Sequence, residues 1–265
     1  MEFWIVQSLN GISFGMLLFL LAAGLSLVFG LMRIVNLTHG SFYLLGAYIG
    51  FTLIERTGSF LVALVVAPLC IAVVGLLMHR FLLRRFQQVE LAQVLLTFGV
   101  LFICADFTLW KWGGYSYVLP KPTFLVVSLT IGSIVFPVYR LFVIATGVVI
   151  ALMLWLMLER TTLGSMVRAG VDDEEMVRGL GINTPKLFTA VFALGAFLAA
   201  LSGVIGGPFV GAYPGADFEV LLLALVVGLL DTFGRALFPE LAMFTIFAPM
   251  AIILALRPRG LFGRV

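Results

Sequence analysis

The amino-acid sequence predicts an all-α fold: a polytopic transmembrane helical bundle of about eight membrane segments, some of them candidates for re-entrant helices. Of the 265 residues, 62% are hydrophobic and only 11% are charged, less than half the charged share of an ordinary soluble domain. Residues 3–32 and 187–216 contain no Asp, Glu, Lys or Arg. Because backbone groups without hydrogen bonds are costly in lipid, apolar runs of this length are expected to form helices.

The expected spans follow one another along a single integral-membrane domain, 1–265, without a soluble module. Segments 41–54 and 218–230 are short for a full crossing, so they are candidates for tilted, broken or re-entrant helices. The first run starts with Glu2 and is too long for an export signal, which favours a retained helix. The spans are 4–31, 41–54, 60–78, 91–110, 138–158, 187–205, 218–230 and 241–256.

Basic residues give the expected orientation of these spans. The loops 79–85 and 159–186 are rich in arginine, and the positive-inside tendency places both in the cytoplasm. Two spans separate them, which agrees with a position on the same side. The N-terminus and the aromatic stretch 110–137 then lie outside. We expect that stretch to be an interfacial anchor with an ordered loop, and a docking surface for an external partner is the alternative.

Glycines at four-residue spacing occur in three of the expected spans. Such spacing lets helix backbones approach closely, so packing within the chain is the expected role. A subunit interface or a permeation path is the alternative. The residues are Gly11 and Gly15, Gly46 and Gly50, and Gly203, Gly207 and Gly211.

The polar loop 159–186 contains a second kind of signal, the caps of a short helix. Asp172 is a good N-cap, Glu175 completes a D-x-x-E pattern, and Glu174 adds negative charge to the first turn. Gly181 is placed to end the helix in the left-handed conformation. A helix of two turns is unstable alone in water, so we expect it to pack against a partner. Contact with lipid headgroups is the alternative, which this row of acids disfavours.

Three separated stretches carry a resemblance to a known family. Glu175, Met176, Val177 and Gly181 follow the spacing of the E-A-A-x-x-x-G core in the cytoplasmic loop of ABC importer permeases, although the alanines are replaced. The stretches are GLSLVFGLMRIVNLTHGSFYLLGAYIG (24–50), RAGVDDEEMVRGLGIN (168–183) and RPRGLFG (257–263). Along nearly its whole length the chain resembles the branched-chain amino acid permeases of the LivH type.

The resemblance implies a permease subunit for branched-chain or related amino acids in the inner membrane of a bacterium or archaeon. Its expected partners are a second permease, two cytoplasmic ATPases and an extracytoplasmic solute-binding protein. Residues 159–186 would be the cytoplasmic coupling loop. ATPase-coupling roles are implied for Glu175 and Gly181, with Arg168, Asp172 and Glu174 beside them. The chain lacks a G-x-x-x-x-G-K-[ST] motif, so ATP is expected on the partner ATPase, and this chain is expected to be neither an enzyme nor a cofactor-binding protein.

Two alternative functions differ in class from an importer. A secondary carrier or channel would need ionisable groups within its spans, and few are present. Between Val227 and Gly228 the family leads us to expect one further glycine-rich crossing, which this chain lacks. The missing segment favours a non-transporting membrane scaffold. Nucleic acid is not an expected partner, because the basic residues cluster in loops and indicate orientation.

Polar residues within the apolar pattern are candidates for a solute pathway or a helix break. Asn36, His39 and Gly40 fall in the family's N-x-x-H-G position. They could break the helix, although we favour capping of the next helix by Asn36 or Thr38, with His39 at the cytoplasmic interface.

Asp106 lies inside an apolar span and is costly there unless it finds a partner or water. We expect pairing near the outer interface, with Lys111 as one partner, and a pathway or gating role is the alternative. The sequence contains no constellation typical of catalysis, and with only two histidines a metal site is not expected.

Overall fold

The computed structural model describes residues 2–32, 36–86, 89–131 and 134–237. The expected span 241–256 and the RPRGLFG tail lie outside these residues. Helices account for most of the described chain, as predicted: α1 (Glu2–Met32), α2 (Thr38–Thr57), α3 (Phe60–Phe81), α4 (Glu90–Trp112), α5 (Val138–Arg160), α6 (Thr162–Asp172), α7 (Glu174–Gly179), α8 (Thr184–Val210) and α9 (Ala216–Leu237), with short 3-10 turns η1 (Leu83–Phe86) and η2 (Thr123–Leu125).

Five stretches of the described chain are long and apolar enough to cross a membrane, judged by length and composition. They are Val6–Met32, Phe60–Phe86, Glu90–Trp112, Val138–Arg160 and Thr184–Val210. The chain is therefore a multi-pass membrane protein with a helical bundle. The two segments predicted to be short, 41–54 and 218–230, lie within the helices α2 and α9, which do not meet these criteria.

A β-hairpin is a departure from the predicted all-α fold. Strands β1 (Ser128–Ile131) and β2 (Ile134–Pro137) pair antiparallel, with Ser128 opposite Pro137 and Leu129 opposite Phe136. The sequence analysis expected an ordered loop here. The overlooked signal is a Gly-Ser pair between two short runs rich in β-branched residues, a pattern typical of a hairpin.

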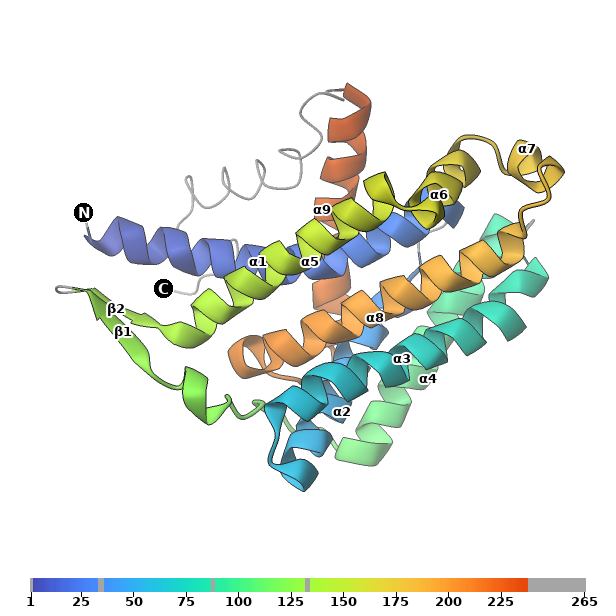
Figure 1. Ribbon diagram of the computed structural model, residues 1–265. Coiled ribbons are helices and arrows are strands. Elements are labelled where there is room, and N and C mark those ends of the chain that lie inside the picture. Colours follow the sequence, from blue (N-terminus) through green and yellow to red (C-terminus); the bar gives the residue numbers. More distant parts are fainter. Residues whose placement is uncertain (1, 33–35, 87–88, 132–133, 238–265) are drawn as a thin grey trace.

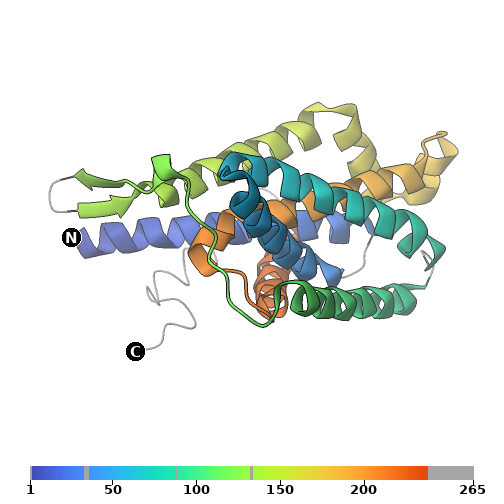
Figure 2. The ribbon, with the colours of Figure 1, turned by 90° about the horizontal axis from the view of Figure 1, so that it is seen from below.

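The long helices lie lengthwise beside one another, while α9 crosses them. Figures 1 and 2 show α9 running steeply across the direction of α1, α5 and α8, and its described residues contact α1 and α2. The turn η1 lies at the same end of the bundle as α6 and α7, whereas the N-terminus and the hairpin lie at the opposite end (Figure 1). The two basic loops therefore share one end, as the orientation argument requires.

The centre of the bundle is the contact between α2 and α8, where backbones come very close. A Cβ atom on Gly203 would lie 2.0 Å from the carbonyl oxygen of Tyr43, and one on Gly46 would lie 2.5 Å from the Cα of Ala200. The predicted packing role of these glycines is thus confirmed for α2 and α8. Gly11 and Gly15 of α1 are also buried.

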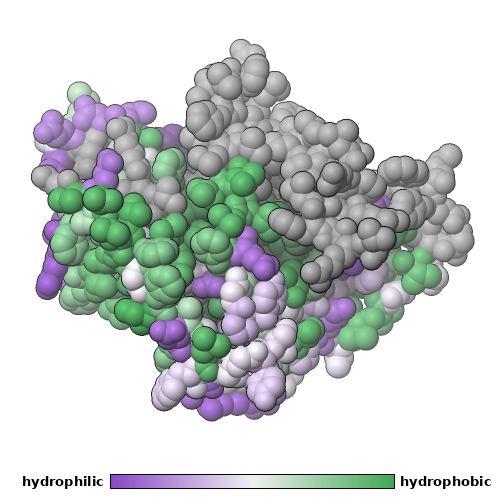
Figure 3. All heavy atoms as spheres, turned by 180° about the vertical axis from the view of Figure 1, so that it is seen from behind, coloured by the Kyte–Doolittle hydropathy of each residue, from purple (hydrophilic) through white to green (hydrophobic). Residues whose placement is uncertain are grey.

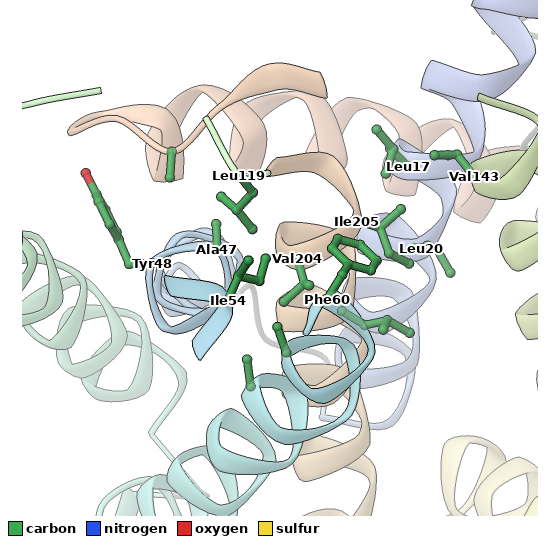
Figure 4. Packing of buried hydrophobic residues seen from close by; sticks show 14 of the residues in the cluster. Leu17, Leu20, Ala47, Tyr48, Ile54, Phe60, Leu119, Val143, Val204 and Ile205 are labelled. Carbon is green, nitrogen blue, oxygen red and sulfur yellow. The ribbon is translucent and has the colours of Figure 1, made fainter. Parts of the chain in front are cut away.

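Side chains from five helices fill the space around this contact. Figure 4 shows Leu20 of α1, Ala47 of α2, Phe60 of α3, Val143 of α5 and Val204 of α8 meeting in one buried cluster. Two buried hydrogen bonds tie α8 to its neighbours. The Tyr139 hydroxyl of α5 donates to the Ile205 carbonyl over 2.7 Å, and the Ser202 hydroxyl donates to the Leu17 carbonyl of α1 over 2.9 Å. Each bond satisfies a buried polar side-chain group at a helix contact.

Large apolar side chains on α3, α4 and α5 face outward, as expected for helices in lipid. Leu69, Leu95 and Met153 each expose more than half of their surface. Figure 3 shows hydrophobic side chains over much of the described surface on the side opposite to Figure 1. Cys70 is exposed within this apolar surface and Cys104 is partly buried, and neither forms a disulfide.

The contact between α2 and α8 can be tested with one added methyl group. We expect Gly203→Ala to lower the free energy of unfolding by about 1–3 kcal/mol, because its Cβ would overlap the Tyr43 carbonyl. Unfolding in mixed micelles would measure the change. Gly99→Ala is the matched control, since nothing lies within 4 Å of a Cβ there. Equal stability of the two variants would contradict the proposed packing.

Candidate functional site

The polar loop 159–186 folds into two helices at one end of the bundle, whereas one was predicted. Helix α6 occupies Thr162–Asp172, so Asp172 ends a helix instead of starting one. Asp173 is the residue that caps α7, because its Oδ1 accepts a hydrogen bond from the Met176 amide over 2.9 Å. The prediction of Asp172 as the N-cap was therefore wrong by one residue. Both aspartates can cap, and only the chain direction set by α6 selects between them.

Helix α6 is anchored firmly to the membrane helices. Its start packs closely on the end of α5, since a Cβ on Gly164 would lie 2.1 Å from the Leu158 carbonyl oxygen. Arg168 donates a hydrogen bond to the same carbonyl and forms an ion pair of 3.7 Å with Glu159. Arg168 therefore connects α6 to α5. The pair is exposed to solvent, so its contribution to stability is small.

The inner face of α6 belongs to a buried apolar cluster. Val167 packs with Leu31 at the end of α1 and with residues of α8. Those residues are Leu187, Phe188 and Val191. A displacement of α6 would therefore act directly on α1 and α8.

The end of α7 confirms the predicted glycine cap. Gly181 has φ of +83°, and its amide donates to the Arg178 carbonyl over 3.0 Å. The amide of Ile182 donates to the Val177 carbonyl over 3.3 Å. This pair of bonds is a Schellman motif, which satisfies carbonyls that a helix end leaves without partners. The chain then turns into α8, capped by Asn183.

Helix α7 has one buried and one exposed side. Val177 is buried, whereas Met176 and Leu180 expose 66% and 75% of their surfaces. These two residues are four positions apart, so they lie on the same face of the helix. Glu175 is also exposed. The side chain of Glu174 lies outside the part of the chain that the structure describes. Helix α7 thus presents an apolar pair, flanked by charge, away from the bundle.

Residues 36–40 form a second site, inside the bundle at the start of α2. Asn36, Thr38 and His39 are all buried. The Asn36 Oδ1 accepts from the Thr38 amide over 3.1 Å, but the N-cap position of α2 is Leu37, so the expected capping by Asn36 or Thr38 is not found in that form. The Thr38 hydroxyl donates instead to the Thr97 carbonyl of α4 over 3.0 Å. The start of α2 is therefore fixed to α4.

The position of His39 differs from the expected cytoplasmic interface. Its ring is fully buried, and its Nε2 lies 3.0 Å from the Leu21 carbonyl in the interior of α1. Gly40 contacts α9, because a Cβ there would lie 2.0 Å from the Asp217 carbonyl oxygen. The structure thus brings Asn36, His39 and Gly40 together between α1, α4 and α9. His39 is buried because α2 begins inside the bundle and not at its cytoplasmic surface.

Asp106 is separate from these residues. Its side chain is exposed on the outward face of α4, and the described side chains include no ion pair between Asp106 and Lys111. The expected pairing is therefore not found, and Asp106 does not line the interior of the described bundle. Among the described residues, no group of three His, Cys, Asp or Glu side chains could hold a metal ion.

Sequence analysis missed a buried acid, Asp217, in the first turn of α9. It exposes only 3% of its surface. The available signal was an acid at the start of an otherwise apolar span, where Glu219 follows two residues later. Periodicity could not separate the two residues, because burial depends on which neighbouring helix covers each face.

Comparison with known proteins finds relatives along nearly the whole chain. Residues 7–246 match a family described as the permease component of branched-chain amino acid transport systems. The high-affinity branched-chain amino acid transport system permease protein LivH of Escherichia coli K12 is 24% identical over 99% of this chain and 96% of its own length. The corresponding protein BraD of Pseudomonas aeruginosa is 23% identical over 98% and 96%.

A probable branched-chain amino acid transport permease protein LivH from Methanocaldococcus jannaschii is 28% identical over 82% of this chain and 70% of its own length. No solved structure matches the chain. The alignment with the Escherichia coli protein spans 307 positions, whereas this chain has 265 residues. That relative therefore contains residues without a counterpart here.

The cap of α7 provides a test of the loop geometry. We expect Asp173→Ala to destabilise α7 by about 1 kcal/mol, because the Met176 amide loses its acceptor. Hydrogen exchange at Met176 and Val177 should become faster. Asp172→Ala is the control: it removes a neighbouring acid from the C-terminal turn of α6, where negative charge is unfavourable. The same acceleration in both variants would contradict the assignment of the cap.

Proposed function

Because the chain belongs to the family of permease components of branched-chain amino acid transport systems, we propose that it forms an importer with four other subunits. These are a second permease, two cytoplasmic ATPases and an extracytoplasmic solute-binding protein. The cargo is a branched-chain or related amino acid, and the complex lies in the inner membrane of a bacterium or archaeon. The observation that carries this proposal is α7, a short capped helix that presents an apolar pair at one end of the bundle.

We propose that α7 inserts into a groove on the ATPase. Met176 and Leu180 supply the apolar contact, and Glu175 supplies charge at its edge. A helix this short has little stability of its own, so the cap at Asp173 and the turn at Gly181 hold its shape before binding. Preorganisation of this kind reduces the ordering cost of association.

Motion of α7 would reach the membrane helices through two connections. One is α6, whose Val167 packs against Leu31 and Leu187. The other is the hydrogen bond of 3.5 Å from the Arg178 guanidinium to the Thr184 hydroxyl at the start of α8. Since α8 packs tightly on α2, a displacement driven by ATP binding to the partner would change the contacts around α2.

The opposite end of the bundle is the proposed contact for the solute-binding protein. It carries the β1–β2 hairpin and the aromatic stretch that precedes it (Figure 1). Trp110 and Tyr115 are highly exposed there. Aromatic side chains of this kind are common both at membrane interfaces and at protein interfaces.

A non-transporting scaffold is the second candidate function. Two observations favour it: the shorter length of this chain relative to its aligned relatives, and the course of α9 across the bundle. A scaffold would bind its partners but show no ATP-dependent uptake. A secondary carrier is less favoured, because few ionisable residues lie within the apolar spans.

Gly181 provides the main test of the ATPase contact. Gly181→Ala forces a side chain into the left-handed region, which costs about 1–2 kcal/mol. We expect the affinity for the ATPase to fall about 5- to 30-fold in a co-purification or binding titration. Gly179→Ala is the matched control, since that position is helical and nothing lies within 4 Å of its Cβ. Unchanged ATPase binding by the Gly181 variant would oppose the docking role of α7.

The apolar pair can be tested separately from the shape of the turn. We expect replacement of both Met176 and Leu180 by Ser to lose ATPase binding while the permease still enters the membrane, because both side chains are exposed in the isolated chain. Loss of two buried apolar contacts at an interface costs several kcal/mol. Normal ATPase-dependent uptake by this variant would rule out the pair as the contact.

A further inference from the structure

Asp217 is a buried acid that takes no part in the proposed contact with the ATPase. It exposes 3% of its surface, and the described side chains include no ion pair that involves it. Its carboxylate does accept the backbone amides of Asp217 and Phe218 in the first turn of α9. Those contacts satisfy part of its hydrogen-bonding capacity but leave a negative charge without a cation. A buried carboxylate without a cation is costly to ionise, so a cationic group of a ligand would be stabilised beside it.

The neighbourhood of Asp217 is built by three helices. Its backbone carbonyl touches Gly40 on α2, where only a glycine allows so close an approach. Its carboxylate interacts electrostatically with the Tyr48 hydroxyl of α2 and with the Cys104 thiol of α4. The start of α9 therefore lies at a junction with α2 and α4. Apolar residues of the same three helices pack into one cluster, including Leu45, Val100 and Val220.

Helix α2 contributes free hydrogen-bonding groups to this junction. Ser41 and Tyr48 are buried, and neither Ser41 Oγ nor the Tyr48 hydroxyl has a hydrogen-bond partner. They are seven residues apart, which places them on the same face of the helix. Buried hydroxyls are rarely left unbonded in the absence of a ligand or water. The Nδ2 of Asn36, at the start of the same helix, is also without a partner.

Aromatic residues cover Tyr48 towards the hairpin end. The Tyr48 ring stacks on Trp112 with centroids 5.0 Å apart and meets Tyr117 edge-on at 6.1 Å. Tyr117 is held by backbone hydrogen bonds of 2.7 and 2.8 Å with Ala212, in the link between α8 and α9. The polar groups of α2 therefore lie behind an ordered aromatic layer.

We propose that Asp217, Ser41 and Tyr48 form a contact site for the transported solute, with Asp217 binding an ammonium group. The hydroxyls of Ser41 and Tyr48 donate to the carboxylate of the same molecule. One acceptor with negative charge and two neutral donors match a zwitterion, and the apolar cluster beside them suits an aliphatic side chain. This inference rests on the proposed function, since it specifies where the amino acid is bound during transport.

The test is Asp217→Asn in the assembled complex, reconstituted with its partners in proteoliposomes. Asn has nearly the same size as Asp and keeps a side-chain oxygen that can accept the backbone amides of the first turn of α9, so the variant removes the charge with little change in shape. We expect the KM for leucine uptake to rise at least about tenfold, because a charge-assisted hydrogen bond is lost. Glu219→Gln is the matched control: this acid lies two residues further on, is exposed, and accepts from the Tyr213 hydroxyl over 2.7 Å.

A second readout separates binding from folding. Direct equilibrium binding of radiolabelled leucine to the detergent-purified complex, without the solute-binding protein, should weaken in Asp217→Asn and remain unchanged in Glu219→Gln. N-acetyl-leucine lacks the ammonium group. In the wild type, N-acetyl-leucine should displace radiolabelled leucine less well than unlabelled leucine does. In Asp217→Asn the two competitors should differ less.

Each outcome supports or overturns the assignment. A wild-type KM in Asp217→Asn, or an equal rise in Glu219→Gln, would overturn it. If the Asp217→Asn complex does not assemble, the variants Ser41→Ala and Tyr48→Phe test the site, since each removes one hydroxyl group. A raised KM for leucine in these variants supports the site, and an unchanged KM overturns it. Failure of the proposed function looks different, because the wild-type complex itself would then show no ATP-dependent uptake.

Discussion

The close approach of α2 and α8 is the constraint on which the rest of the structure depends. Lipid tails are as apolar as a leucine side chain, so helices in a membrane gain little from the hydrophobic effect when they associate. What remains is van der Waals contact at short range. Gly46 and Gly203 provide it by removing the side chains that would separate the two backbones. With α2 held against α8, the helices α3, α4 and α9 pack on α2, and α1 packs on α8.

This central position of α2 makes its polar residues informative. His39 and Thr38 are buried because α2 starts inside the bundle, and each finds a carbonyl on a neighbouring helix. Ser41 and Tyr48 do not. The two ends of the molecule thus have different physical roles. The loop of α6 and α7 has an exposed apolar pair on a helix that is already folded. The junction of α2, α4 and α9 instead contains buried hydroxyl groups without hydrogen-bond partners in an apolar interior.

The sequence predicted the polar loop 159–186 more closely than the membrane interior. Local rules sufficed for Gly181, whose left-handed cap follows from the residue type at a helix end. They failed by one residue at Asp173, because two adjacent acids cap equally well. They failed more widely for Asp106 and Asp217. Each is an acid within or at the start of an apolar run, yet one is exposed and the other is buried.

Composition and apolar run length by themselves determined a multi-pass helical membrane protein, and the motifs within three separated stretches determined the family to which it belongs. Those properties depend on residue types and on spacing within one segment. The tertiary structure alone decided that α9 crosses the bundle, that His39 is deep inside it, and that the backbone of Asp217 meets Gly40. Such contacts join residues far apart in the chain, and helical periodicity does not specify which neighbour covers a given face.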